Sequence, residues 1–164
     1  MSSAPSPRAA IEWDEARAVA IIAEHAGKPG AMLPILHALQ EEFGFVPEGA
    51  KPLIAKALNL SRAEVHGVVT FYHDFRSTPA GRHVLKLCRA EACQSMGCET
   101  LHRGALEKLG IAIGETTADG QLTVEPIYCL GLCATAPSAL IDGRPVGRLT
   151  PERLDGIVRE AILS

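Results

Sequence analysis

The segment His83-Val84-Leu85-Lys86-Leu87-Cys88 decides the fold of this chain. Its polar and large apolar residues alternate, which is typical of a β-strand with one buried face. The residues that follow, 97–109, place apolar side chains at helical spacing and end at a glycine, so they predict a helix. Residues 121–128 then alternate again and predict a second strand.

A hairpin and a final helix complete this half of the chain. Residues 139–141 and 145–147 flank Asp142-Gly143, a dipeptide that adopts the positive φ of a tight two-strand turn. Thr150-Pro151 provides an N-cap and a proline at the first helical position, so residues 151–162 predict a helix. The order strand, helix, strand, strand, strand, helix predicts a small α/β sandwich, with helices covering a four-stranded sheet as in thioredoxin-like folds.

The first half of the chain has a different character. Apolar residues recur at three- and four-residue steps, and Ser61 and Glu64 have the spacing of a capping box that opens a further helix. We therefore expect three regions: a mobile N-terminus over 1–10, which is rich in Ser, Pro and Ala, an all-helical region over 11–78, and the α/β domain over 79–164.

Composition excludes several classes of protein. The 164 residues carry 16 basic and 19 acidic side chains, a net charge of -3, and neither half forms a basic arm for nucleic acid. Charge, Gly or Pro interrupts every apolar stretch before the roughly 20 residues that a bilayer span needs, and the Met1-Ser-Ser-Ala-Pro start is unlike a signal peptide. We expect a cytoplasmic protein with no direct membrane insertion.

The cysteines are the candidate functional residues. Their number, five, is odd, which favours metal ligation or redox chemistry over a disulfide framework. Cys88 and Cys93 follow the first predicted strand with C-x4-C spacing, and Cys129 and Cys133 follow the second with C-x3-C spacing. Because neighbouring strands lie about 5 Å apart, the two loops can face each other at one edge of the sheet. Four thiolates are the usual ligands of a [2Fe–2S] cluster.

The cysteine pattern has three other interpretations. Structural zinc also accepts these spacings and stays open as a rival. Thiol–disulfide exchange is disfavoured because the chain has no C-x-x-C pair. Simple burial of small side chains is disfavoured because loops rich in Gly and polar residues offer little burial. Gly131 and a helix start near Cys93 would supply N–H groups to an anionic cluster.

The fifth cysteine, Cys98, has the same C-x4-C spacing from Cys93. It falls in the first turns of the helix predicted over 97–109. We expect it to be a buried spare thiol rather than a substitute ligand.

These motifs resemble a known family. The cysteine spacing, Gly44-Phe45-Val46-Pro47 and Gly67-Val68-Val69-Thr70-Phe71-Tyr72 resemble the thioredoxin-like [2Fe–2S] subunit of NADH dehydrogenases over nearly all of residues 11–162. Within that family, the sequence around the cysteines is most similar to the gamma subunit of soluble, molybdenum-containing, NAD-dependent formate dehydrogenases.

The resemblance implies a cofactor and partners. It implies a [2Fe–2S] cluster on Cys88, Cys93, Cys129 and Cys133, and docking against an iron–sulfur subunit that carries FMN and the NAD site. A larger molybdenum-containing catalytic subunit would belong to the same complex. The resemblance also favours contact between part of residues 70–75 and the flavin-bearing subunit.

Two classes of function remain open at this stage. The chain has no Gly-rich nucleotide motif, and four thiolates leave a cluster no open position for substrate, so one-electron transfer without a catalytic residue is expected. Formate dehydrogenase is the leading parent complex, with respiratory NADH:quinone oxidoreductase and NAD-reducing hydrogenase as alternatives. The second class is a structural zinc-binding adaptor without a redox role.

Overall fold

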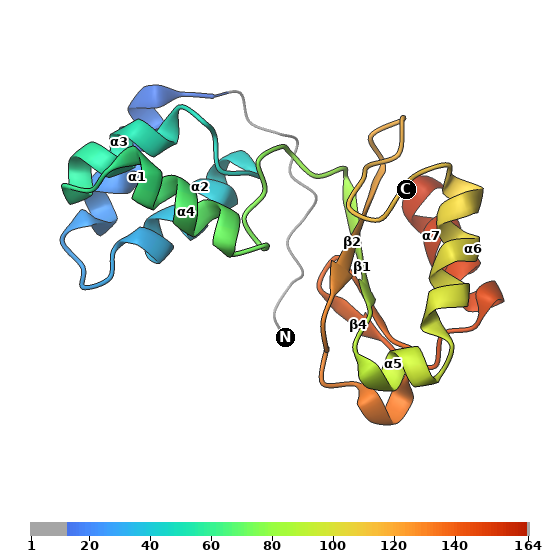
Figure 1. Ribbon diagram of the computed structural model, residues 1–164. Coiled ribbons are helices and arrows are strands. Elements are labelled where there is room, and N and C mark those ends of the chain that lie inside the picture. Colours follow the sequence, from blue (N-terminus) through green and yellow to red (C-terminus); the bar gives the residue numbers. More distant parts are fainter. Residues whose placement is uncertain (1–12, 164) are drawn as a thin grey trace. The chain divides into compact units, whose positions relative to one another are not determined.

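The computed structural model describes residues 13–163, and the described chain divides into two compact units between Pro79 and Ala80 (Figure 1). Each unit has its own hydrophobic core. The mobile segment predicted over 1–10 lies outside the described residues.

The first unit is entirely helical where it is described. It contains α1 (Glu15–Ala26), α2 (Met32–Phe43), α3 (Ala50–Leu58) and α4 (Arg62–Phe71). Its core consists of buried side chains from all four helices, among them Ile21, Leu36, Phe43, Ile54 and Val65. The capping box predicted at the start of α4 is present, with Ser61 and Glu64 satisfying each other's backbone N–H groups.

The second unit is built on a four-stranded sheet. Its strands β1 (His83–Cys88), β2 (Leu122–Ile127), β3 (Ala139–Ile141) and β4 (Arg144–Val146) lie in the order β2-β1-β3-β4. β1 pairs with β2 in parallel, whereas the β1–β3 and β3–β4 pairs are antiparallel. The α/β domain predicted from the order of elements is therefore present.

Two helices cover one face of this sheet. α6 (Cys98–Leu109) and α7 (Pro151–Leu163) lie side by side against it (Figure 1). Leu85 and Leu87 point to that face because residues two apart share a face of a strand, and both are buried in the core with Leu154 of α7. Lys86 points to the other face, where it forms an ion pair of 3.6 Å with Glu125.

Some boundaries differ from those that the sequence predicts. α3 begins at Ala50, three residues before the predicted apolar stripe at Leu53. The helix can include Pro52 because this residue lies in the first turn, where a missing N–H costs no helical hydrogen bond. Two short helices lie where the sequence predicts loops: α5 (Glu91–Ser95) and the 3-10 helix η1 (Cys133–Thr135). Among the described residues, no helix combines the length and apolar character that a membrane crossing requires.

Candidate metal centre

The candidate site forms where the parallel strands β1 and β2 end. Cys88 is the last residue of β1 and lies opposite Ile127 of β2. The Arg89 N–H donates to the Ile127 carbonyl at 2.8 Å, which ties the start of one cysteine segment to the end of the neighbouring strand. Because the two strands run in the same direction, both cysteine segments leave the sheet at one edge (Figure 1).

The first thiol pair is Cys88 and Cys93. Both side chains are only 2% exposed. Cys93 lies in α5, so the expectation that it sits in a loop is wrong, and so is the expectation of little burial for this first cysteine segment. The short helix turns Cys93 back over the end of β1, and this tertiary packing produces the burial.

Hydrogen bonds favour the thiolate form of Cys88. Burial by itself raises its pKa, but donors from Ala90, Cys93, Cys129 and Ser138 outweigh it and lower the pKa below the ordinary value of a thiol. The donors from Ala90 and Cys129 are backbone N–H groups. Since Cys129 belongs to the second segment, that segment also lowers the pKa of Cys88.

The second thiol pair is Cys129 and Cys133, whose sulfur atoms lie 3.8 Å apart. Both residues are exposed. The Gly131 N–H donates to Cys129 Sγ at 3.4 Å, as expected of a glycine that brings the backbone close to the site. Cys129 itself has a left-handed φ of 79°, a conformation that costs a residue with a side chain about 1–3 kcal/mol and that clusters at functional sites.

The two thiol pairs interact electrostatically. A hydrogen bond and the charge of Cys129 raise the pKa of Cys133, and the charge of Cys93 adds to this effect. Four thiolates at this edge therefore repel one another. A bound cation would relieve this repulsion, because metals bind the deprotonated thiolate.

The donor set fits a binuclear iron–sulfur centre. In a [2Fe–2S] cluster each iron takes two protein ligands, so two thiol pairs are required rather than four thiols around one point. Over residues 13–163, no three His, Cys, Asp or Glu side chains converge in the way that a single metal ion requires. One tetrahedral zinc ion would instead take all four ligands at about 2.3 Å around a single point.

Cys98 differs from the other cysteines in its environment. It is the first residue of α6, is fully buried, and packs with Cys88 and Cys93. Burial raises the pKa of its thiol, and the negative charges of Glu99 and Cys93 raise it further. The buried position matches the sequence expectation.

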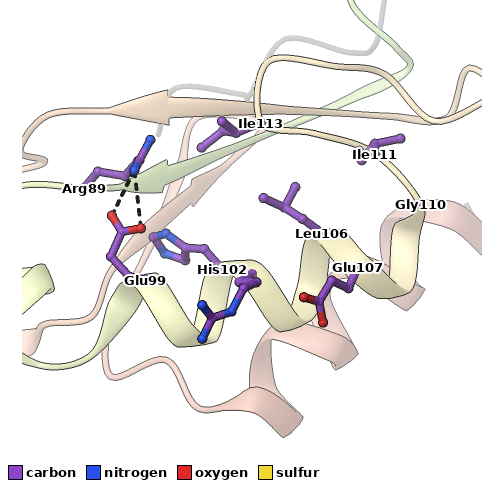
Figure 2. Close-up of a pocket in the computed structure, with 9 residues that line it drawn as sticks. Arg89, Glu99, His102, Leu106, Glu107, Gly110, Ile111 and Ile113 are labelled. Carbon is purple, nitrogen blue, oxygen red and sulfur yellow. Dashed lines mark hydrogen bonds and ion pairs between the residues drawn. The ribbon is translucent and has the colours of Figure 1, made fainter.

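A separate cavity of about 290 Å³ lies beside α6 (Figure 2). Arg89 at one end forms a bidentate ion pair with Glu99, and Leu106, Ile111 and Ile113 provide apolar walls. His102 points into this region and is 3% exposed. Neither of its ring nitrogens has a hydrogen-bond partner among the described residues.

Sequence reasoning missed two residues that shape the site. Ser138, directly before β3, is buried with its hydroxyl 3.5 Å from Cys93 Sγ. Gly147 packs so closely on Thr135 of η1 that an added Cβ would lie 2.4 Å from Thr135 Oγ1. Ser138 could have been identified as the lone hydroxyl in the otherwise apolar run Ala136-Pro137-Ser138-Ala139. Gly147 has no comparable signal in the sequence.

Comparison with known proteins agrees with this geometry. Residues 18–161 match the family of thioredoxin-like [2Fe–2S] ferredoxins. The chain belongs to this family. Membership implies a [2Fe–2S] cluster in this chain and confirms the thioredoxin-like fold expected from the sequence.

Relatives of this ferredoxin chain are subunits of larger oxidoreductases. It is 37% identical to an NADH-quinone oxidoreductase subunit of Pseudomonas aeruginosa over 129 residues, 79% of this chain and 76% of the relative. It is 32% identical to the NADP-reducing hydrogenase subunit HndA of Solidesulfovibrio fructosivorans over 133 residues, 81% of this chain and 78% of the relative.

A solved structure of an NAD⁺-reducing [NiFe]-hydrogenase in the air-oxidised state resembles the ferredoxin chain with a TM-score of 0.65 and 30% identity. The match covers 78% of this chain but only 22% of the hydrogenase chain. The fold seen here is thus one part of a longer chain in that enzyme.

Proposed function

We propose that this chain is a non-catalytic electron-transfer subunit, which exchanges single electrons with an FMN- and NAD-binding partner subunit. Its [2Fe–2S] cluster would be held by Cys88, Cys93, Cys129 and Cys133. The observation that carries the proposal is the placement of two thiol pairs where the parallel strands β1 and β2 end, with the Arg89 N–H bonded to the Ile127 carbonyl at that point.

The residues around the cysteines have distinct roles in this proposal. The buried pair, Cys88 and Cys93, anchors the site to the sheet and to α5. The exposed pair, Cys129 and Cys133, provides the side from which a partner can approach. The cluster, when bound, supplies a one-electron couple, and the thiolates hold it without leaving an iron position open to substrate.

The relatives favour a parent complex of the NADH-quinone oxidoreductase or hydrogenase type, because they are subunits of such enzymes. These comparisons support the alternatives that the sequence left open better than they support formate dehydrogenase. Formate dehydrogenase, with its larger molybdenum-containing subunit, is a more specific proposal for the parent complex, and it rests on the sequence around the cysteines. We place the complex in the cytoplasm, a reducing compartment that suits five cysteines that form no disulfide.

A docking surface on the helical unit is part of the same proposal. Phe71 is 71% exposed and contacts Tyr72 edge to face at a centroid distance of 5.1 Å. Together with Leu60 and Val68 they line a shallow apolar hollow. Phe75, in contrast, is buried and belongs to the core. Exposed apolar patches of this kind mark contacts with other proteins, so we expect Phe71 and Tyr72 to touch the partner.

Metal and acid-labile sulfide analysis of anaerobically purified chain tests the cluster. We expect about two irons and two sulfides per chain, with an EPR signal that is absent in the oxidised protein and emerges on reduction with dithionite. One zinc per chain, without sulfide or signal, would overturn the proposal in favour of the structural zinc adaptor.

Affinity purification of the native complex through this chain tests the parent enzyme. The complex should contain FMN and transfer electrons to or from NAD. Supplying formate, hydrogen, or NADH with a quinone in separate assays identifies the donor and acceptor. NAD reduction with formate supports formate dehydrogenase as the parent complex. Activity with hydrogen or quinone and none with formate contradicts it.

A further inference from the structure

Ser138 occupies a fixed position beside the buried thiol pair, Cys88 and Cys93. It is 1% exposed, and its carbonyl accepts a hydrogen bond of 3.1 Å from the Cys88 N–H. That bond extends the β1–β3 pairing, in which Leu87 lies opposite Ala139. The backbone of Ser138 is therefore held by the same ladder that positions Cys88.

The side chain of Ser138 is directed at sulfur. Its Oγ lies 3.5 Å from Cys93 Sγ. A hydroxyl both donates and accepts, and a thiol does so weakly, so either atom can donate while Cys93 is protonated. Once Cys93 is a metal-bound thiolate it has no proton, and only the serine O–H remains as the donor.

Burial makes this contact consequential. Water cannot readily replace a donor in a site that is 1% exposed, and hydrogen bonds are electrostatically stronger there than in water. The surrounding residues Pro137 and Ala139 are also buried and apolar. A buried hydroxyl needs a partner, and the sulfur of Cys93 provides it.

We propose that the Ser138 hydroxyl donates a hydrogen bond to the thiolate of Cys93 and thereby raises the reduction potential of the cluster, an inference that rests on the proposed function. One-electron reduction adds one negative charge to the cluster and its thiolates. A donor aimed at sulfur stabilises the more negative state more strongly, because hydrogen bonds to charged acceptors are the stronger ones. Hydrogen bonds to sulfur are among the factors that set iron–sulfur potentials.

Redox titration of the full chain tests this inference, with the [2Fe–2S] EPR signal as the readout. Ser138→Ala should shift the ratio of reduced to oxidised cluster about tenfold toward the oxidised form at a given potential, which is a downward shift of about 59 mV for a one-electron couple. Ser95→Ala is the matched control, because Ser95 lies two residues from Cys93 but its hydroxyl donates to the Ala92 carbonyl. Its potential should equal that of the wild type.

A second pair of variants separates hydrogen bonding from packing. Ser138→Thr and Ser138→Val introduce side chains of nearly the same shape, and only the threonine carries a hydroxyl. The threonine variant should keep a potential near the wild type, and the valine variant should fall with alanine. If Ser138→Ala fails to load iron, the comparison of the threonine and valine variants still tests whether the hydroxyl raises the potential.

Two outcomes would count against the inference in different ways. If the wild type carries the cluster but the Ala variant keeps its potential, or Thr and Val shift alike, the hydroxyl is not a donor to sulfur and the inference is wrong. If the wild type itself lacks iron and sulfide, the proposed function fails first.

Discussion

Cys98 and Cys93 lie close together, yet we expect only one of them to hold iron. Cys98 faces the packed start of α6, and burial raises the pKa of its thiol, which disfavours the thiolate that a metal binds. Cys98→Ser should therefore keep about two irons per chain, while losing about 1–3 kcal/mol of stability through an unpartnered buried hydroxyl. Cys93→Ser should lose or alter the cluster. Iron content and the EPR spectrum of the Cys98→Ser and Cys93→Ser variants provide the measurement. If Cys98→Ser loses the cluster and Cys88→Ser keeps it, the ligand assignment is wrong.

His102 predicts a dependence of stability on pH. Burial lowers the pKa of its ring, the charge of Glu99 partly opposes this, and Arg89 adds to it. In the unfolded chain the imidazole titrates near its ordinary value of about 6.5, so between that value and the lower folded pKa the unfolded state binds more protons. The protonation equilibrium of His102 therefore costs no stability above about pH 6.5, and the protein loses stability as the pH falls from there toward the folded pKa.

His102→Leu should reduce this loss, because it removes the titrating ring together with two nitrogens that lack partners among the described residues. Thermal unfolding at about pH 7.5 and about pH 5.5, on either side of the ordinary imidazole pKa and followed by circular dichroism, compares the two proteins. The gap between their midpoints should widen in favour of the leucine variant at the lower pH. Equal pH dependence in both proteins would show that His102 does not titrate in this range.

At the scale of elements, periodicity predicted the long helices and β1, β2 and the hairpin, because each carries a repeated apolar pattern or a turn signal. It could not predict α5, which spans five residues and is too short to display a helical period. The same limit applies to η1, which spans three. The cysteine spacing proposed the site, but the burial of Cys88 and Cys93 depends on how α5 folds back, which no local pattern encodes.

The contact between Gly147 and η1 supports a prediction at this scale. The Thr135 carbonyl accepts from the Arg148 N–H, so the chain after β4 holds the helix that begins at Cys133. A Cβ on Gly147 would lie 2.7 Å from Thr135 Cβ and 2.9 Å from its carbonyl oxygen, which forces η1 to move. Gly147→Ala should cost about 1–3 kcal/mol and reduce the iron retained per chain.

Gly156→Ala is the matched control for this change. Gly156 is an exposed residue inside α7, and a Cβ there meets nothing within 4 Å. Alanine at that position should keep full iron and stabilise the protein by about 0.5–1 kcal/mol, since glycine disfavours helix. If Gly147→Ala retains iron as well as this control does, the close packing on Thr135 does not position Cys133.

At the scale of the whole molecule, the two units have separate cores and separate tasks. The core of the second unit is built from Leu85, Val124, Leu154 and their neighbours, all after Pro79, and the five cysteines and Ser138 lie there too. The exposed aromatics Phe71 and Tyr72 belong to the first unit. Under the proposed function, this division gives the cluster ligands to one unit and much of the partner contact to the other.

The division predicts that a fragment of residues 80–164 folds and loads the cluster without the helical unit. A fragment of this size is long enough to fold alone, and metal binding adds folding free energy, so the loaded fragment should be more stable than the apo form. Its iron and sulfide content and its EPR spectrum should match those of the full chain.

In pull-down with the flavin-bearing partner, however, the fragment should bind more weakly than the full chain, because it lacks Phe71 and Tyr72. A fragment that cannot fold or hold iron would mean that the helical unit stabilises the metal centre, and equal partner binding by fragment and full chain would remove the docking role from the aromatic surface.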